Sequence, residues 1–241
     1  MQFTFFNYVK AIMKLLAIET ATESCSASLL IEDEYITLSE LAPRRHNEII
    51  LSMCEQVLSQ TETSLSQLDA IAFGRGPGSF TGVRLAASVT QGMALGQDLP
   101  VVPVSSLAAL AQAAHEQTQS SQVLTCIDAR MQEVYFGLYE LKNNYMQLLG
   151  EEQVIAPDLV DVKIDDECHG AGSGWKTYAN ELIQSLGKNI VYSEDTFPQA
   201  ESVAKLASLY YKEKKYISAV EALPVYIRDN VAEKPKNKMV F

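Results

Sequence analysis

The feature that most constrains the fold is a strand–turn–strand pattern that occurs twice in the chain. Near the start, the apolar run Lys14–Thr20 ends in a carboxylate, and after a short polar turn the alternating segment Ser24–Glu32 follows. The segment Gln122–Leu141 repeats this order. Because one copy heads each half of the chain, the pattern predicts a duplicated α/β lobe. The matched positions are Ile18-Glu19 with Ile127-Asp128, and Cys25, Ala27 and Leu29 with Val134, Phe136 and Leu138.

Strands and helices alternate through the rest of the chain, which predicts a mixed sheet in each lobe. In the first half we expect strands at Glu34–Leu41, Leu68–Phe73 and Leu99–Val104, and helices at His46–Gln60, Phe80–Leu95 and Ser105–Glu116. In the second half we expect strands at Tyr145–Leu149 and Asn189–Tyr192, a helix that the turn Gly170–Trp175 opens and that ends at Leu186, a helix at Glu201–Lys214, and an extended piece at Leu223–Arg228. The polar stretch Glu116–Gln122 marks the predicted lobe boundary. Residues 1–12 then form an extension outside the fold, 13–116 the first lobe, and 117–241 the second lobe with its tail.

A glycine-rich loop, GRGPGSFTGVR (Gly74–Arg84), has the character of a phosphate-binding loop. It lacks the spacing and the lysine of a P-loop, and Ser79 stands where a dinucleotide-binding motif has its third glycine. We therefore predict a structural role, with Ser79 or Thr81 capping the next helix. The alternative is anion binding at two helix starts, by Gly76, Gly78 and Ser79 here and by Gly172 and Gly174 in the turn GAGSGW.

Glu19 and Asp128 head the two turns of the repeat. In an ATP-hydrolysing protein, carboxylates at such turns would orient Mg²⁺ or water, and a following glycine would let phosphate approach. Here Thr20-Ala21 and Ala129-Arg130 follow instead. The prediction is that both carboxylates cap their own turns.

No pattern for covalent or metal-dependent catalysis stands out, so we predict no catalytic and no metal-binding residues. A second metal ligand one helical turn after His46 would occupy position 50, which is isoleucine. The four cysteines are far apart and form no CxxC pair, which indicates reduced, mostly buried thiols.

Two helices carry more apolar surface than one sheet can cover. The apolar stripes of His46–Gln60 span an arc of about 200°, whereas docking on one sheet needs about 100°. The helix Gly82–Gly96 is apolar on nearly all sides and has a face of small residues. One interpretation is burial within the lobe; the other, which we favour, is a subunit interface. The predicted interface residues are His46, Ile49, Ile50, Met53 and Val57 on the first helix, and Gly82, Leu85, Ala86, Val89 and Met93 on the second.

The formal net charge of −11 argues against autonomous nucleic-acid binding, because such binding depends on lysine and arginine neutralising phosphates. No apolar run approaches the roughly 20 residues of a membrane span, and the first residues lack the pattern of a signal peptide. These features predict a cytoplasmic protein with no membrane association.

Several segments together resemble the bacterial TsaB/YeaZ family. They are MKLLAIETATESCSASLL from Met13, PRRHNEIIL (Pro43–Leu51), AFGRGPGSFTGVRLA (Ala72–Ala86), IDARMQEVY (Ile127–Tyr135) and PVYIRDNVA (Pro224–Ala232). The resemblance runs from Met13 to about Ala232. It implies an actin-like, Hsp70-like ATPase (ribonuclease H-like) fold in two lobes.

The resemblance also implies a function. Members of this family are non-catalytic subunits in the synthesis of threonylcarbamoyladenosine at position 37 of tRNAs that read codons beginning with A. It implies a catalytic partner, the paralogue TsaD, bound through the first lobe's helices, with the ATPase TsaE and tRNA joining the complex. ATP and metal would then belong to the partner subunits, and the isolated chain would form a homodimer. Two other functions stay open: an actin-like ATPase or kinase that uses Glu19, Asp128 and the glycine turns, and a metallopeptidase.

Overall fold

The computed structural model describes residues 12–228. The predicted N-terminal extension lies outside the described residues apart from Ile12, and so does the part of the second lobe beyond Arg228.

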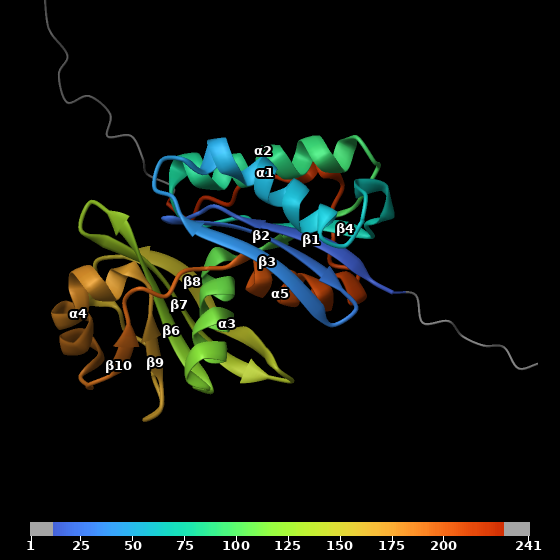
Figure 1. The fold of residues 1–241 in the computed structure, drawn as a ribbon. Helices are drawn as coiled ribbons and strands as arrows, with labels where there is room; N and C mark the ends of the chain where they lie inside the picture. The colour runs from blue at the N-terminus through green and yellow to red at the C-terminus, as the bar shows by residue number, and fades with distance from the viewer. Residues whose placement is uncertain (1–11, 229–241) are drawn as a thin grey trace, which may run out of the picture.

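Each lobe is built on a five-stranded mixed sheet, and the two sheets have the same strand order (Figure 1). The first runs β3-β2-β1-β4-β5 and the second β8-β7-β6-β9-β10. In each, the central strand pairs antiparallel with the next strand in sequence and parallel with the strand on its other side. The predicted duplicated α/β fold is confirmed. The strands are β1 Lys14–Glu19, β2 Ser24–Ile31, β3 Glu34–Leu41, β4 Ala70–Gly74, β5 Val101–Val104, β6 Gln122–Arg130, β7 Glu133–Lys142, β8 Tyr145–Ile155, β9 His169–Ala171 and β10 Val191–Ser193.

The helices form layers outside and between the two sheets (Figure 1). On the outer face of the first sheet lie α1 (His46–Ser59) and α2 (Phe80–Leu95), and on the outer face of the second lies α4 (Ser173–Leu186). Between the sheets lie α3 (Ser106–Thr118) and α5 (Ala200–Lys212). Short 3₁₀ turns occur at Leu65–Gln67, Pro157–Leu159 and Ala219–Glu221.

The two middle helices are exchanged between the lobes. Helix α3 follows the last strand of the first sheet but packs on the second sheet, and α5 follows the second sheet but packs on the first. The two helices also contact each other, and one buried apolar cluster joins them to both sheets. The predicted boundary after Glu116 therefore separates the sheets, while each sheet takes a helix from the other side of that boundary.

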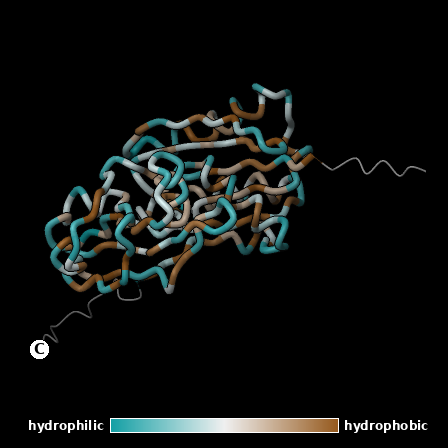
Figure 2. The backbone as a smooth tube through the Cα atoms, turned by 90° about the horizontal axis from the view of Figure 1, so that it is seen from below, coloured by the Kyte–Doolittle hydropathy of each residue, from teal (hydrophilic) through white to brown (hydrophobic). Residues whose placement is uncertain are grey.

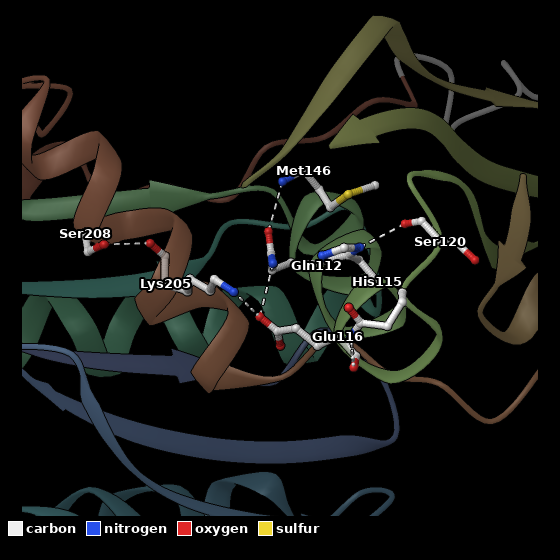
Figure 3. A network of polar contacts seen from close by, with 8 residues as sticks. Gln112, His115, Glu116, Ser120, Met146, Lys205 and Ser208 are labelled. Carbon is white, nitrogen blue, oxygen red and sulfur yellow. Dashed lines mark hydrogen bonds and ion pairs between the residues drawn. The ribbon is translucent and has the colours of Figure 1, made fainter. Parts of the chain in front are cut away.

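A polar network reinforces this exchange (Figure 3). Lys205 of α5 donates to the carboxylate of Glu116 on α3 at 2.7 Å, and Gln112 donates to the same oxygen at 3.1 Å. The side-chain oxygen of Gln112 accepts from the Met146 amide of β8 at 2.9 Å. Gln112 has no exposed surface, so the network satisfies a buried amide while it joins α3, α5 and the second sheet.

Most predicted elements are present, and Glu34–Leu41 and Phe80–Leu95 have the predicted bounds. The strand β9 was not predicted, because three residues are too few to show a periodicity and Gly170 suggests a turn. The matching of the central strands is wrong by one position: Ile18 packs in the outer core of the first sheet, whereas Ile127 packs between the sheets and Cys126 takes the outer position. The matched residues of the returning strands do lie in the two outer cores: Cys25, Ala27 and Leu29 in the first, and Val134, Phe136 and Leu138 in the second.

Figure 2 shows the same two lobes from below, with hydrophilic stretches in many of the peripheral loops. Within residues 12–228, no helix is long and apolar enough to cross a membrane.

Candidate functional site

The predicted partner surface lies on the outer side of the first lobe, where α1 and α2 are neighbours (Figure 1). Half of the predicted interface residues are buried inside the lobe. Ile50, Val57 and Ala86 have no exposed surface, Met53 is 7% exposed, and Gly82 is also buried. Ile50, Met53, Val57 and Ala86 belong to the core between these helices and the first sheet. In the isolated chain these five residues present little or no surface to a partner, and their contact with one stays a prediction.

The other five predicted residues remain accessible. His46, Ile49, Leu85, Val89 and Met93 are half-buried. The four apolar residues among them cover the same core from its outer edge. They lie where two helices meet and still present part of their surface to solvent.

Three exposed apolar residues on these helices were not predicted as interface. Leu51 is 53% exposed, Phe80 59% and Leu95 58%. Apolar periodicity shows that a helix has a wide apolar arc, but it does not show which edge of the arc faces the sheet. Gly92 of α2 is also exposed, and a side chain at this position would meet no atom within 4 Å. The backbone of α2 is therefore accessible to solvent at Gly92.

The small-residue face of α2 packs within its own lobe. A Cβ atom at Gly82 would collide with the backbone carbonyl of Thr20, and the Thr20 hydroxyl donates to the Gly82 carbonyl at 2.7 Å. This contact draws the start of α2 against the β1–β2 turn. Small residues are needed there for close packing.

The glycine-rich loop is explained by the same turn. Gly74 lies against the Glu19 carboxylate and Gly78 against the Ala21 carbonyl, and neither position has room for a Cβ atom. The Ser79 amide donates to the Ala21 carbonyl at 2.7 Å, and Gly76 has a φ of +93°. Ser79 occupies the cap position of α2, but its side chain makes no capping hydrogen bond, so the predicted side-chain cap is wrong.

The second glycine turn is also a packing feature. Cβ atoms at Gly172 and Gly174 would lie 2.6 Å from the Cys126 carbonyl oxygen and 2.8 Å from the Cys126 Cβ, respectively. The Gly172 amide already donates to Ser193. These contacts account for the glycines, and an anion site there stays a prediction.

Glu19 is fully buried, and both of its carboxylate oxygens accept hydrogen bonds from its own lobe. One accepts from the Ala21 amide at 2.6 Å and the other from the Ser106 hydroxyl at 2.8 Å. Burial raises the pKa of this carboxyl above its ordinary value, although the hydrogen bonds from Ala21 and Ser106 oppose the shift. The predicted turn-capping role of Glu19 is confirmed.

Asp128 heads the matching turn of the second lobe and, like Glu19, accepts a hydrogen bond from the amide two residues later. Its carboxylate accepts from the Arg130 amide at 2.8 Å and from the Arg130 guanidinium at 3.2 Å. Here 17% of the side-chain surface remains exposed. After Ala129, the residues Arg130, Met131 and Gln132 have φ values of 62°, 55° and 61°, a left-handed run that non-glycine residues rarely form.

A cleft of about 1290 Å³ separates these two turns. Its walls come from both lobes and from the segment that follows the last 3₁₀ turn. They are the β1–β2 turn, the starts of α1, α2 and α4, the glycine-rich loop, residues 127–130 and residues 225–228. The Glu19 side chain does not line the cleft, because Gly74 and the Ala21 amide enclose it.

His46 lies at the start of α1 and lines this cleft, and its Nε2 atom is buried without a hydrogen-bond partner. Within residues 12–228 no group of three or more histidine, cysteine or acidic side chains is arranged to hold a metal ion. All four cysteines are free and buried, as predicted, and burial raises the pKa of the Cys54 thiol to about 12.

Comparison with known proteins decides the family. A family model described as TsaD, tRNA N6-adenosine threonylcarbamoyltransferase, matches residues 37–236. The tRNA threonylcarbamoyladenosine biosynthesis protein TsaB of Haemophilus influenzae is 41% identical over 232 residues, which cover 92% of this chain and 96% of that protein. TsaB of Escherichia coli is 39% identical over 226 residues, covering 92% and 97%. The chain belongs to the TsaB/YeaZ family.

Solved structures agree with this assignment. YeaZ from Pseudomonas aeruginosa superimposes with a TM-score of 0.85 at 41% identity, covering 89% of this chain and 99% of that one. A second structure from the same organism, described as similar to the peptidase YeaZ, has a TM-score of 0.84 at 40% identity, covering 90% and 100%. The two sheets of equal strand order are the duplicated-lobe fold that membership of the TsaB/YeaZ family implies.

Proposed function

We propose that this chain is a non-catalytic subunit of the machinery that forms threonylcarbamoyladenosine in tRNA. Its TsaB relatives are named for that pathway, and the family model that it matches is named for the threonylcarbamoyltransferase. The chain would bind a TsaD-like transferase and hold it in an active arrangement, without carrying out the transfer to adenosine 37 itself.

The main support for the non-catalytic role is the burial of the Glu19 carboxylate and its hydrogen bonds. A carboxylate that orients a metal ion or a water must point its oxygens into the cleft. Both oxygens of Glu19 instead accept hydrogen bonds from its own lobe, and the side chain has no exposed surface. Asp128 differs, because it lines the cleft and pairs with the exposed Arg130. The rival ATPase or kinase function would need the Glu19 turn to rearrange.

The partner surface that we propose is the outer edge of the α1–α2 pair. Ile49, Leu85, Val89 and Met93 offer a half-buried apolar strip that already rests on a rigid core. Gly92, exposed nearby on α2, allows the backbone of a partner helix to come close. Such a strip suits a paralogue of the same fold, because an equivalent helix pair could lie across it.

The wider assembly follows from the same proposal. A chain of net charge −11 would reach tRNA through its partners, and ATP and metal would belong to the TsaD-like and TsaE-like subunits. In the absence of the transferase, the same apolar strip would form a homodimer.

The experiment is to size the full chain mixed with its TsaD-like partner. Val89→Arg places a charge on the strip, and we expect it to weaken the heterodimer by about 2–4 kcal/mol, the range of an interface hot spot. The matched control is Gln184→Arg, an exposed position on α4 of the second lobe, which should bind normally. Both variants should keep the circular dichroism spectrum of the parent. Normal affinity of a folded Val89→Arg variant would remove α2 from the interface.

A further inference from the structure

The segment Leu223–Arg228 crosses the cleft between the lobes and contacts both of them. It is extended and belongs to neither sheet. Residues 225–228 line the cleft. It contains the sequence PVYIR, which is part of one of the segments that resemble the TsaB/YeaZ family. This sequence has no part in the proposed partner surface.

The first half of this segment is fixed to the first lobe. The Val225 amide donates to the Arg75 carbonyl in the glycine-rich loop at 2.9 Å. The Tyr226 hydroxyl accepts from the Arg84 guanidinium at 2.7 Å. That guanidinium also lies 3.4 Å above the Phe80 ring, which is a cation–π contact. The segment is thereby joined to the glycine-rich loop by a backbone hydrogen bond and to the start of α2 by a side-chain hydrogen bond.

The last described residue of the segment is fixed to the second lobe. The Arg228 guanidinium forms an ion pair with Glu133 at the start of β7, and only 13% of the Arg228 side chain is exposed. It also lies 3.5 Å from the sulfur of Met131, in the left-handed turn between β6 and β7. A charged hydrogen bond shielded from solvent in this way is stronger than an exposed one.

We propose that Leu223–Arg228 is a strap along the wall of the cleft that couples the start of α2 to the β6–β7 turn. The exchanged helices α3 and α5 already hold the lobes together, so the strap is not needed to prevent their separation. What it adds is a direct link between two surface elements of different lobes. Breaking the first-lobe anchor should weaken the second-lobe anchor by the same free energy as breaking the second-lobe anchor weakens the first, because coupling between two sites is reciprocal. This inference concerns the chain alone and needs no partner.

Hydrogen exchange of the full chain tests the coupling in both directions. Glu133→Ala removes the second-lobe anchor, and we expect about tenfold faster exchange at the Val225 amide and at the Val83 amide of α2, the scale of one lost hydrogen bond to a charged group. The matched control is Glu140→Ala, which removes an exposed ion pair with Lys142 on the same strand β7 and should leave both amides unchanged.

In the reverse direction, Tyr226→Phe removes the hydrogen bond to Arg84 and should speed exchange at the Arg130 amide in the β6–β7 turn. Tyr216→Phe, at another exposed tyrosine, is the control. The strap proposal is overturned if each variant alters exchange only at its own anchor. It is also overturned if the Val225 amide of the parent chain exchanges as fast as an unprotected amide.

Discussion

The β1–β2 turn and the β6–β7 turn share one hydrogen bond but differ in how exposed their carboxylates are. In each, an acidic residue at the end of the central strand accepts a hydrogen bond from the amide two residues later. Glu19 is then enclosed by Gly74, Ser106 and the Ala21 amide, whereas Asp128 stays partly exposed beside a left-handed turn whose Met131 is 77% exposed. The two turns share this hydrogen bond. The first turn is closed and packs against the start of α2, and the second is open to the cleft.

The two lobes also differ in the helices that cover their outer faces. The connection between β3 and β4 contains α1, but the matching connection between β8 and β9 contains only the 3₁₀ turn Pro157–Leu159. The first lobe therefore carries a helix pair and the second only α4. The asymmetry places the proposed partner surface on the first lobe.

The largest expected effect comes from adding one methyl group under α2. Gly82→Ala forces a Cβ atom against the Thr20 backbone carbonyl, and we expect it to destabilise the fold by about 4 kcal/mol or more. Gly92→Ala, on the open side of the same helix, should stabilise it by up to about 1 kcal/mol through helix propensity. Urea denaturation of both variants measures the difference. Equal destabilisation would show that the face of α2 toward the β1–β2 turn is not tightly packed.

The next effect separates the two carboxylates. Glu19→Ala leaves the Ala21 amide and the Ser106 hydroxyl without partners in a buried site, which should cost about 3 kcal/mol. Asp128→Ala removes a partly exposed contact and should cost at most about 1 kcal/mol. Denaturation midpoints at neutral pH provide the comparison, and a larger loss for Asp128→Ala would reverse the account of which turn is closed.

The smallest effect is a pH dependence of the Glu19 turn. Its carboxyl has a raised pKa in the folded state, so between the ordinary value of 4.5 and the folded value the native chain binds the extra proton. Stability from this group is greatest below 4.5 and falls as pH rises through that window, with a slope of at most about 1.4 kcal/mol per pH unit. The stability of the parent relative to Glu19→Gln should therefore decline with pH in this range. A relative stability that increases with pH would mean that the Glu19 carboxylate is favoured by its site.

Sequence patterns predicted the duplicated lobes, most strands and helices, and the turn-capping role of Glu19, because each depends on residues close in the chain. They did not predict which apolar residues of α1 and α2 are buried. Ile50 and Ile49 are neighbours with the same chemistry, and only the docking of the helix on the sheet makes one core and the other accessible. The sequence also did not predict that α3 and α5 each pack on the other lobe's sheet, because either sheet could bury the apolar face of either helix. The role of Gly82 depended on Thr20, a residue far away in the sequence.

The central claim is that this chain supports a catalytic partner and does not process a nucleotide with its own turns. Calorimetric titration of the isolated full chain with Mg-ATP, together with an assay for released phosphate, tests it most directly. We expect no micromolar binding and no turnover, because the Glu19 carboxylate is enclosed in its own lobe and the Asp128 carboxylate is paired with Arg130. Micromolar binding with turnover that Glu19→Gln abolishes would contradict the account.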